Sequence, residues 1–134
     1  MKRRFKNADE AYKGVLDYIL TEGETFDDTT AVFNCGFYID NPSDNHIKDE
    51  QRNWKLEYAE AEWEWYLSGD PSIDKLGDLY GKVPPIWERM CNSDRVVNSN
   101  YGFQWQRNNQ IDYVVGKLRE NKKTRHAAIS IYDC

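Results

Sequence analysis

The sequence predicts a domain of mixed α/β (α+β) structure, in which helices pack on a layered sheet. Two observations carry this prediction: apolar residues recur at helical spacing in several segments, and two other segments have the composition or the alternation of strands. At 134 residues the chain is long enough for one domain with a real core, which we place over residues 1–134. Helices and strands alternate along it, as in layered domains.

The composition excludes several classes of protein. Hydrophobic residues make up 40% and aromatic residues 14%, so we expect a folded chain and not a disordered one. The net charge is −5 and most lysines and arginines are scattered, which disfavours binding to nucleic acid or to a membrane surface. We find no signal peptide and no apolar run that could span a bilayer, and therefore expect a cytoplasmic location.

The cysteines and histidines do not form a recognisable site. Cys35, Cys91 and Cys134 are odd in number and far apart, so we interpret them as reduced thiols and not as a disulfide frame. His46 and His126 lack metal-ligand spacing with any cysteine. The sequence therefore predicts no metal site.

The first forty residues predict a helix, a loop and a strand. The helix begins after an Asn7 cap and ends at Gly23. Residues 21–30 are acidic and rich in turn formers, which indicates a loop. Apolar residues then alternate from Thr29 to Ile39, which predicts a strand with Cys35 on its buried face.

A long helix is predicted from about His46 to Leu67. Its apolar stripe consists of Trp54, Tyr58, Ala61 and Trp65. Glu62 lies on a flank of this stripe, so we expect aromatic side chains against it. Two hypotheses stay open: a general acid–base group, or a structural carboxylate paired with Lys55 or Lys75. Three other acids should lie in solvent: Glu57, Glu60 and Glu64.

Three more helices and one strand follow. Asp70-Pro71 begins a short helix that ends at Gly81, Pro84-Pro85 begins another, and the third runs from Gln110 to Glu120. The remaining segments are predicted to be a polar loop, a basic turn and a final strand: residues 92–100, Asn121 to Thr124 and Ala127 to Tyr132.

An ordered set of motifs spans this second half. It comprises Glu62 before Trp65-Tyr66-Leu67-Ser68-Gly69-Asp70, then Ile86-Trp87, Tyr101-Gly102-Phe103-Gln104-Trp105 and Thr124-Arg125-His126. In order and spacing the set resembles the thymidylate synthase superfamily, and the resemblance covers roughly the N-terminal half of a family member. Asn98-Ser99-Asn100 and the run Glu62-Trp63-Glu64-Trp65-Tyr66 are more similar to the phage deoxycytidylate hydroxymethylases than to the synthases.

The resemblance implies a one-carbon transferase. In the family a cysteine thiolate adds to C6 of a pyrimidine, and C5 takes a one-carbon unit from 5,10-methylenetetrahydrofolate. The expected reaction converts dCMP into 5-hydroxymethyl-dCMP, and the alternative is synthase-type methylation of dUMP. The family also implies a homodimer or a complementing chain, and the host cytoplasm as location if a phage encodes the protein.

The resemblance also implies roles for six residues. Glu62 would be the general acid–base, Tyr101 would help to remove the C5 proton, and Asn100 would position water. Trp87 would line the folate pocket. Arg125, with His126 where the family usually has a second arginine, would bind the nucleotide phosphate.

The catalytic cysteine of the family is expected after Cys134, and Cys134 itself comes too early for that role. A shortened, non-catalytic paralogue that acts as a dimer partner therefore stays an alternative. An unrelated aromatic-rich α/β binding module is a further one.

Overall fold

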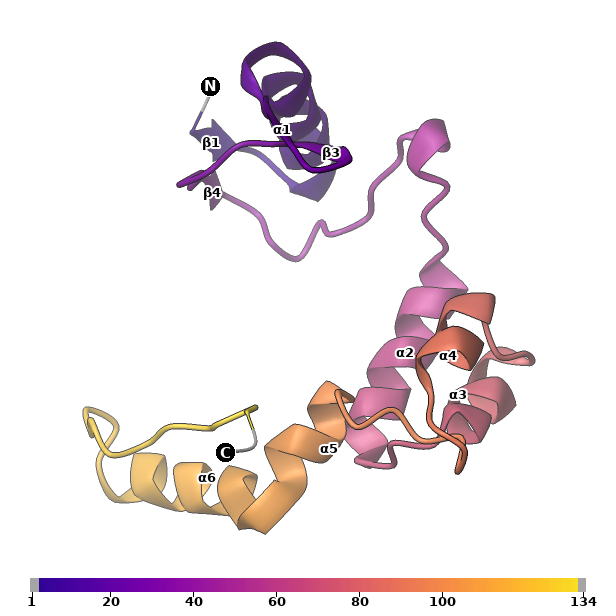
Figure 1. Ribbon diagram of the computed structural model, residues 1–134. Helices are drawn as coiled ribbons and strands as arrows, with labels where there is room; N and C mark the ends of the chain where they lie inside the picture. Colours follow the sequence, from indigo (N-terminus) through magenta and orange to yellow (C-terminus); the bar gives the residue numbers. More distant parts are fainter. Residues whose placement is uncertain (1–2, 133–134) are drawn as a thin grey trace. The chain divides into compact units, whose positions relative to one another are not determined.

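The computed structural model describes residues 3–132, and the chain divides between Leu56 and Glu57 into two compact units (Figure 1). The mixed α/β class is confirmed, because helices occur together with two small sheets. Each sheet has two strands in the part of the chain that is described. A single domain over residues 1–134 stays a prediction.

The helix α1, Ala8–Glu22, has both of the predicted ends. The Asn7 side chain accepts a hydrogen bond from the Glu10 N–H at 3.0 Å, which satisfies one free donor of the first turn. At the other end the Gly23 N–H donates to the Ile19 carbonyl. Capping residues therefore determine this helix from local sequence alone.

A small parallel sheet packs on α1. The strand β1, Arg4–Phe5, pairs with β4, Tyr38–Ile39. The Phe5 ring is buried against Gly14, where an added Cβ would overlap with it. Gly14 thus permits close packing of β1 on the helix.

The predicted loop at residues 21–30 was wrong, because much of this segment is an antiparallel hairpin. The strands β2, Glu24–Phe26, and β3, Thr29–Ala31, pair in register around a two-residue turn. Asp27 lies in the turn with a φ of 53°, a left-handed conformation that Asp tolerates better than most residues. The acidic composition of the segment had hidden the strand pattern of β2, whereas β3 falls within the predicted strand from Thr29.

The predicted strand from Thr29 to Ile39 was wrong over most of its length. Only its two ends are strands, β3 and β4, and they belong to different sheets. Between them Asn34 has a φ of 54°, which interrupts an extended chain. Cys35 is exposed, contrary to its predicted burial.

The predicted helix from His46 begins ten residues later. Residues Glu50–Arg52 form the short 3-10 helix η1, and Asn53 then adopts a left-handed conformation with a φ of 47°. The α-helix α2 runs over Leu56–Ser68, so Trp54 lies outside it. Gly69 ends α2 with a φ of 69°.

The second unit has its core between α2 and two short helices. These are α3, Ile73–Tyr80, and α4, Pro85–Met90. The predicted end of α3 at Gly81 and the predicted start of α4 at the prolines are confirmed. The N-cap of α3 is Ser72 and not Asp70. The buried residues of this core are Ala61, Trp65, Ile73, Leu76 and Val97.

Two helices complete the unit. The helix α5, Tyr101–Gln106, leads through the 3-10 helix η2, Arg107–Asn109, into α6, which has the predicted bounds Gln110–Glu120. Gly102 lies directly on the backbone of Tyr66, where any side chain would overlap with the Tyr66 carbonyl. A glycine is therefore required for α5 to approach α2 so closely.

The segment Ala127 to Tyr132, predicted as a strand, joins no sheet within residues 3–132. The side-chain amide of Gln110 takes the place of a neighbouring strand. Its Oε1 accepts from the Ser130 N–H at 2.8 Å, and its Nε2 donates to the Ser130 carbonyl at 3.0 Å. Arg107 Nη2 donates to the Tyr132 carbonyl at 2.7 Å.

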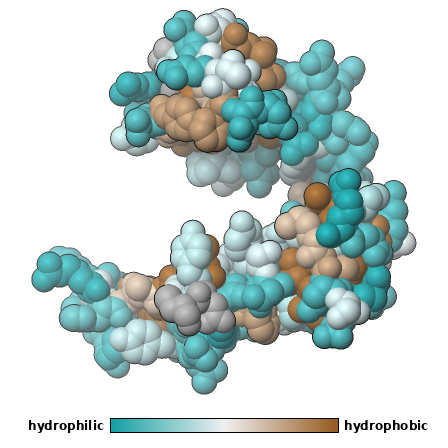
Figure 2. All heavy atoms as spheres, viewed as in Figure 1, coloured by the Kyte–Doolittle hydropathy of each residue, from teal (hydrophilic) through white to brown (hydrophobic). Residues whose placement is uncertain are grey.

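Many large apolar side chains are exposed on both units. Figure 2 shows hydrophobic residues in brown among the hydrophilic ones in teal. Examples are Leu20, Phe26, Trp63, Leu67 and Met90, each more than half exposed. Among residues 3–132, no helix has both the length and the hydropathy needed to cross a bilayer.

Candidate active site

The helix α2 presents two tyrosines and one glutamate on the same face. Tyr58, Glu62 and Tyr66 follow each other at intervals of four residues, which places them above one another along a helix. All three are partly buried. The predicted solvent positions of Glu57, Glu60 and Glu64 are confirmed, since all three are exposed.

A hydrogen-bonded relay joins this face to α4. The indole Nε1–H of Trp87 donates to the Tyr58 hydroxyl at 2.8 Å. The Tyr58 hydroxyl donates in turn to Glu62 Oε1, also at 2.8 Å. The prediction that aromatic side chains lie against Glu62 is thus confirmed. Within the described part of the chain, Glu62 forms no ion pair with Lys55 or Lys75.

Both tyrosines beside Glu62 are held in the protonated form. Burial is the main cause that raises the pKa of Tyr58 to about 12; the hydrogen bond from Trp87 opposes the rise and Glu62 adds to it. Burial, and then the charge of Glu62, also raise the pKa of Tyr66. At neutral pH both hydroxyls therefore remain hydrogen-bond donors next to the carboxylate.

The core of the second unit holds Trp87 in place. Its ring meets Trp65 edge-to-face, with 5.1 Å between the centroids. Tyr80 of α3 packs in the same way on Tyr58, at 5.2 Å. Because Trp65 is fully buried, Trp87 packs against a closely packed part of the core.

The helix α5 brings Tyr101 and Asn100 to the other end of the same face. The Tyr101 ring lies edge-on to Tyr66, 5.6 Å between centroids, and stacks with Trp105 at 6.4 Å. Asn100 caps α5, accepting the Phe103 N–H at 2.9 Å, and is buried. Its Nδ2 donor has no partner among the described residues.

Arg125 and His126 lie elsewhere on the second unit. Both are exposed and follow the turn after α6, where the His126 N–H donates to Thr124 Oγ1. No contact within residues 3–132 joins either side chain to Glu62. The structure thus links Glu62 to Trp87 through hydrogen bonds and places Tyr101 against Tyr66 of the same helix face, with Asn100 beside Tyr101 as the cap of α5.

Two residues of the cluster, Tyr58 and Tyr66, had no predicted role in the site. Tyr58 was assigned to the apolar stripe, and Tyr66 was part of a family motif only. The spacing Tyr-x-x-x-Glu-x-x-x-Tyr could have revealed them, because residues four apart on a helix are neighbours.

Of the described cysteines, Cys91 belongs to the same unit as this cluster, and its N–H donates to the Trp87 carbonyl at 3.0 Å. Cys35 is exposed in the first unit, and the Cys91 thiol donates to the Glu88 carbonyl at 3.5 Å. Cys134 lies outside the described residues. Within the described part of the second unit, no hydrogen bond joins the Cys91 thiol to Glu62.

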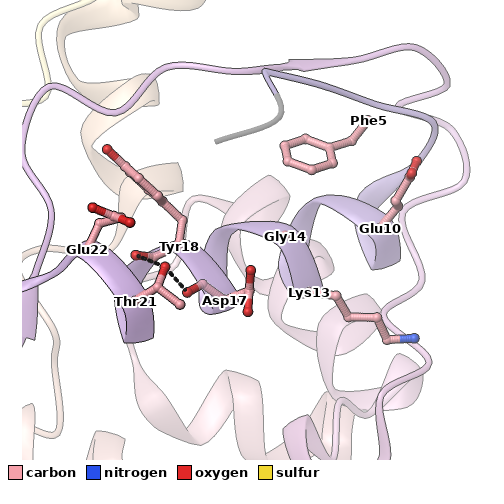
Figure 3. A pocket seen from close by; sticks show the side chains of 8 residues that line it. All are labelled: Phe5, Glu10, Lys13, Gly14, Asp17, Tyr18, Thr21 and Glu22. Carbon is pink, nitrogen blue, oxygen red and sulfur yellow. Dashed lines mark hydrogen bonds between the residues drawn. The ribbon is translucent and has the colours of Figure 1, made fainter.

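A separate hollow of about 690 Å³ lies on the first unit (Figure 3). Phe5 and one face of α1 line it, and the Thr21 hydroxyl inside it donates to backbone carbonyls of the same helix. None of the predicted site residues belongs to it. The Glu62 cluster is the better candidate for chemistry, because it combines a carboxylate with protonated donors and aromatic walls.

Comparison with known proteins places these residues in a family. The family model described as thymidylate synthase matches residues 10–134. The deoxycytidylate 5-hydroxymethyltransferases of Enterobacteria phages T4, T2 and T6 are each 35% identical to the chain over 79 residues. These matches cover 57% of this chain and 30% of each phage protein, so the similar region is less than a third of the relatives' length.

Proposed function

The chain belongs to the thymidylate synthase family, and from that premise we propose that it supplies the acid–base part of a one-carbon transferase site. The substrate is a pyrimidine deoxynucleoside monophosphate. The proposed reaction is hydroxymethylation of dCMP at C5, because the similar phage proteins carry that activity in their names.

The hydrogen-bonded relay from Trp87 through Tyr58 to Glu62 carries the proposal. A carboxylate with a defined hydrogen-bond donor and aromatic neighbours is oriented for proton transfer. Glu62 is therefore the general acid–base group. It would move protons between ordered water and the pyrimidine ring.

Tyr101 and Asn100 act beside Glu62 in this proposal. Tyr101 helps to remove the C5 proton, and its edge-on contact with Tyr66 holds its ring against the helix that carries Glu62. Asn100 helps to position water. Its buried Nδ2 has no hydrogen-bond partner among the described residues, and a water molecule would supply the acceptor that this donor lacks.

The residues also fit a folate cofactor. Trp87 is partly buried and uses its only polar atom on Tyr58, so the rest of its ring could offer the flat heterocycle of 5,10-methylenetetrahydrofolate only aromatic contact. When bound, that cofactor supplies the one-carbon unit. In this proposal Trp87 would contact the bound cofactor, and Glu62 would donate and accept protons.

Arg125 and His126 bind phosphate in the proposal, and they do so for a second subunit. Their exposure and their separation from Glu62 within residues 3–132 are consistent with a role across a dimer. The nucleophilic thiolate is assigned to a segment outside these 134 residues, either in the same protein or in a complementing chain.

Direct assay tests the function. The active form, meaning the full-length natural protein or this chain with a complementing chain, is incubated with methylenetetrahydrofolate and either dCMP or dUMP. The expected product is hydroxymethylated dCMP, identified by its mass. Methylated dUMP would instead support a synthase. Absence of any one-carbon transfer would indicate a non-catalytic paralogue.

A further inference from the structure

The direction of both hydrogen bonds in the relay follows from the atoms involved. An indole N–H can only donate, so the Tyr58 oxygen is the acceptor at its 2.8 Å contact with Trp87. The single hydroxyl proton of Tyr58 is then available for Glu62 Oε1. Glu62 Oε1 is therefore the acceptor in its contact with Tyr58.

We propose that Tyr58 is a positioning residue, which holds Glu62 Oε1 as a fixed acceptor and couples the orientation of the carboxylate to Trp87. This inference rests on the proposed function of Glu62.

The surroundings of Tyr58 suit this role. Its ring is clamped edge-to-face by Tyr80 on α3, so the hydroxyl position is determined by packing as well as by hydrogen bonds. The groups that face it are Trp87 from α4, Tyr80 from α3, and Glu62 and Tyr66 from α2. Because its proton is held tightly in this setting, Tyr58 orients the carboxylate and does not take part in proton transfer at neutral pH.

Two variants separate this role from simple packing. Tyr58→Phe keeps the ring and removes only the hydroxyl. Tyr80→Phe is the matched control, because it removes a hydroxyl from the ring that packs on Tyr58 and leaves both hydrogen bonds of the relay in place.

The first readout is independent of activity. The indole N–H resonance of Trp87 is recorded by NMR in the active form and assigned with Trp87→Phe. We expect Tyr58→Phe to move this resonance upfield, because the indole N–H loses the hydroxyl oxygen that accepts its hydrogen bond. Tyr80→Phe should leave the resonance nearly unchanged. An equal shift in both variants would overturn the relay.

The second readout is kinetic. Tyr58→Phe should lower kcat by about tenfold, the order expected for one hydrogen bond to a charged acceptor, with the nucleotide Kd unchanged. In a Glu62→Gln background the same substitution should cause almost no further loss, because Tyr58 acts through Glu62. Equal losses in both backgrounds would overturn the proposal. If the wild type transfers no one-carbon unit, the proposed function fails, and the Trp87 resonance still decides whether the relay exists.

Discussion

Glu62 is one of four glutamates on α2, and its surroundings set it apart from the other three. It is partly buried and accepts a hydrogen bond from Tyr58, whereas Glu57, Glu60 and Glu64 are exposed. A carboxylate in this setting has a defined orientation, which suits it to act on a bound substrate. Substitution of Glu62 alone therefore tests the proposed chemistry directly.

Replacing Glu62 by Gln should lower kcat of the active form by roughly 10²-fold or more, because the amide cannot exchange a proton. Nucleotide affinity, measured by calorimetry, should stay nearly constant. Glu64→Gln, on the solvent side of the same helix, is the matched control and should retain full activity. Parallel losses of affinity and turnover in Glu62→Gln would assign Glu62 a structural role instead.

Gly102 makes the contact between α5 and α2 possible, so Gly102→Ala should destabilise the second unit by about 3 kcal/mol. A Cβ there overlaps with the Tyr66 backbone, which cannot move without disturbing α2. Urea unfolding followed by tryptophan fluorescence measures the change. Gly116→Ala on α6 is the control, since it meets open space and should stabilise the helix by ~0.5 kcal/mol. Similar stability of both variants would contradict the close approach.

At the scale of elements, the C-terminal segment depends on side chains from neighbouring helices. Gln110 on α6 forms both backbone hydrogen bonds of Ser130, and Arg107 on η2 holds the Tyr132 carbonyl. The apolar residues Ile129 and Ile131 then face a hollow lined by Val114 and its neighbours on α6. The extended conformation of this segment is thus maintained by two side chains.

Gln110→Ala should reduce protection of the Ser130 amide from hydrogen exchange by about fivefold, which corresponds to the loss of roughly 1 kcal/mol in hydrogen bonding. Ser130→Ala is the control, because it keeps the backbone groups that Gln110 binds. If the alanine at position 110 leaves this amide as protected as in the wild type, other contacts must hold the segment.

At the scale of the whole molecule, the chain leaves much apolar surface uncovered. Exposed large side chains occur in both units, including Phe33 and Tyr38 in the first and Ile86 and Tyr113 in the second. Monomeric proteins rarely leave large apolar patches in water. We therefore propose association with a second copy or a complementing chain, as the family resemblance implies.

The isolated 134-residue chain should accordingly bind a hydrophobic dye and self-associate as its concentration rises. Sedimentation velocity across a concentration series measures this directly. Raised ionic strength should strengthen the association or leave it unchanged, because apolar burial is not screened by salt. A single monomeric species at all concentrations, without dye binding, would contradict the proposal.

Local signals predicted several elements correctly. The bounds of α1 and α6, and the ends at Gly81 and Pro85, follow from caps, glycines, prolines and helical periodicity, which act within a few residues. Strands were predicted poorly, because their stability depends on partners distant in sequence. The alternation from Thr29 to Ile39 gave no sign that Asn34 would divide it between two sheets.

In the candidate site, too, relations within one helix could be predicted from the sequence and contacts between helices could not. The position of Glu62 on the flank of an aromatic stripe follows from the sequence alone, because the geometry of one helix sets that relation. The contact of Trp87 with Tyr58, 29 residues away, and the approach of Tyr101 to Tyr66 beside Gly102 follow instead from the packing of separate helices. Such contacts depend on how closely separate helices pack, and helical periodicity describes each helix alone.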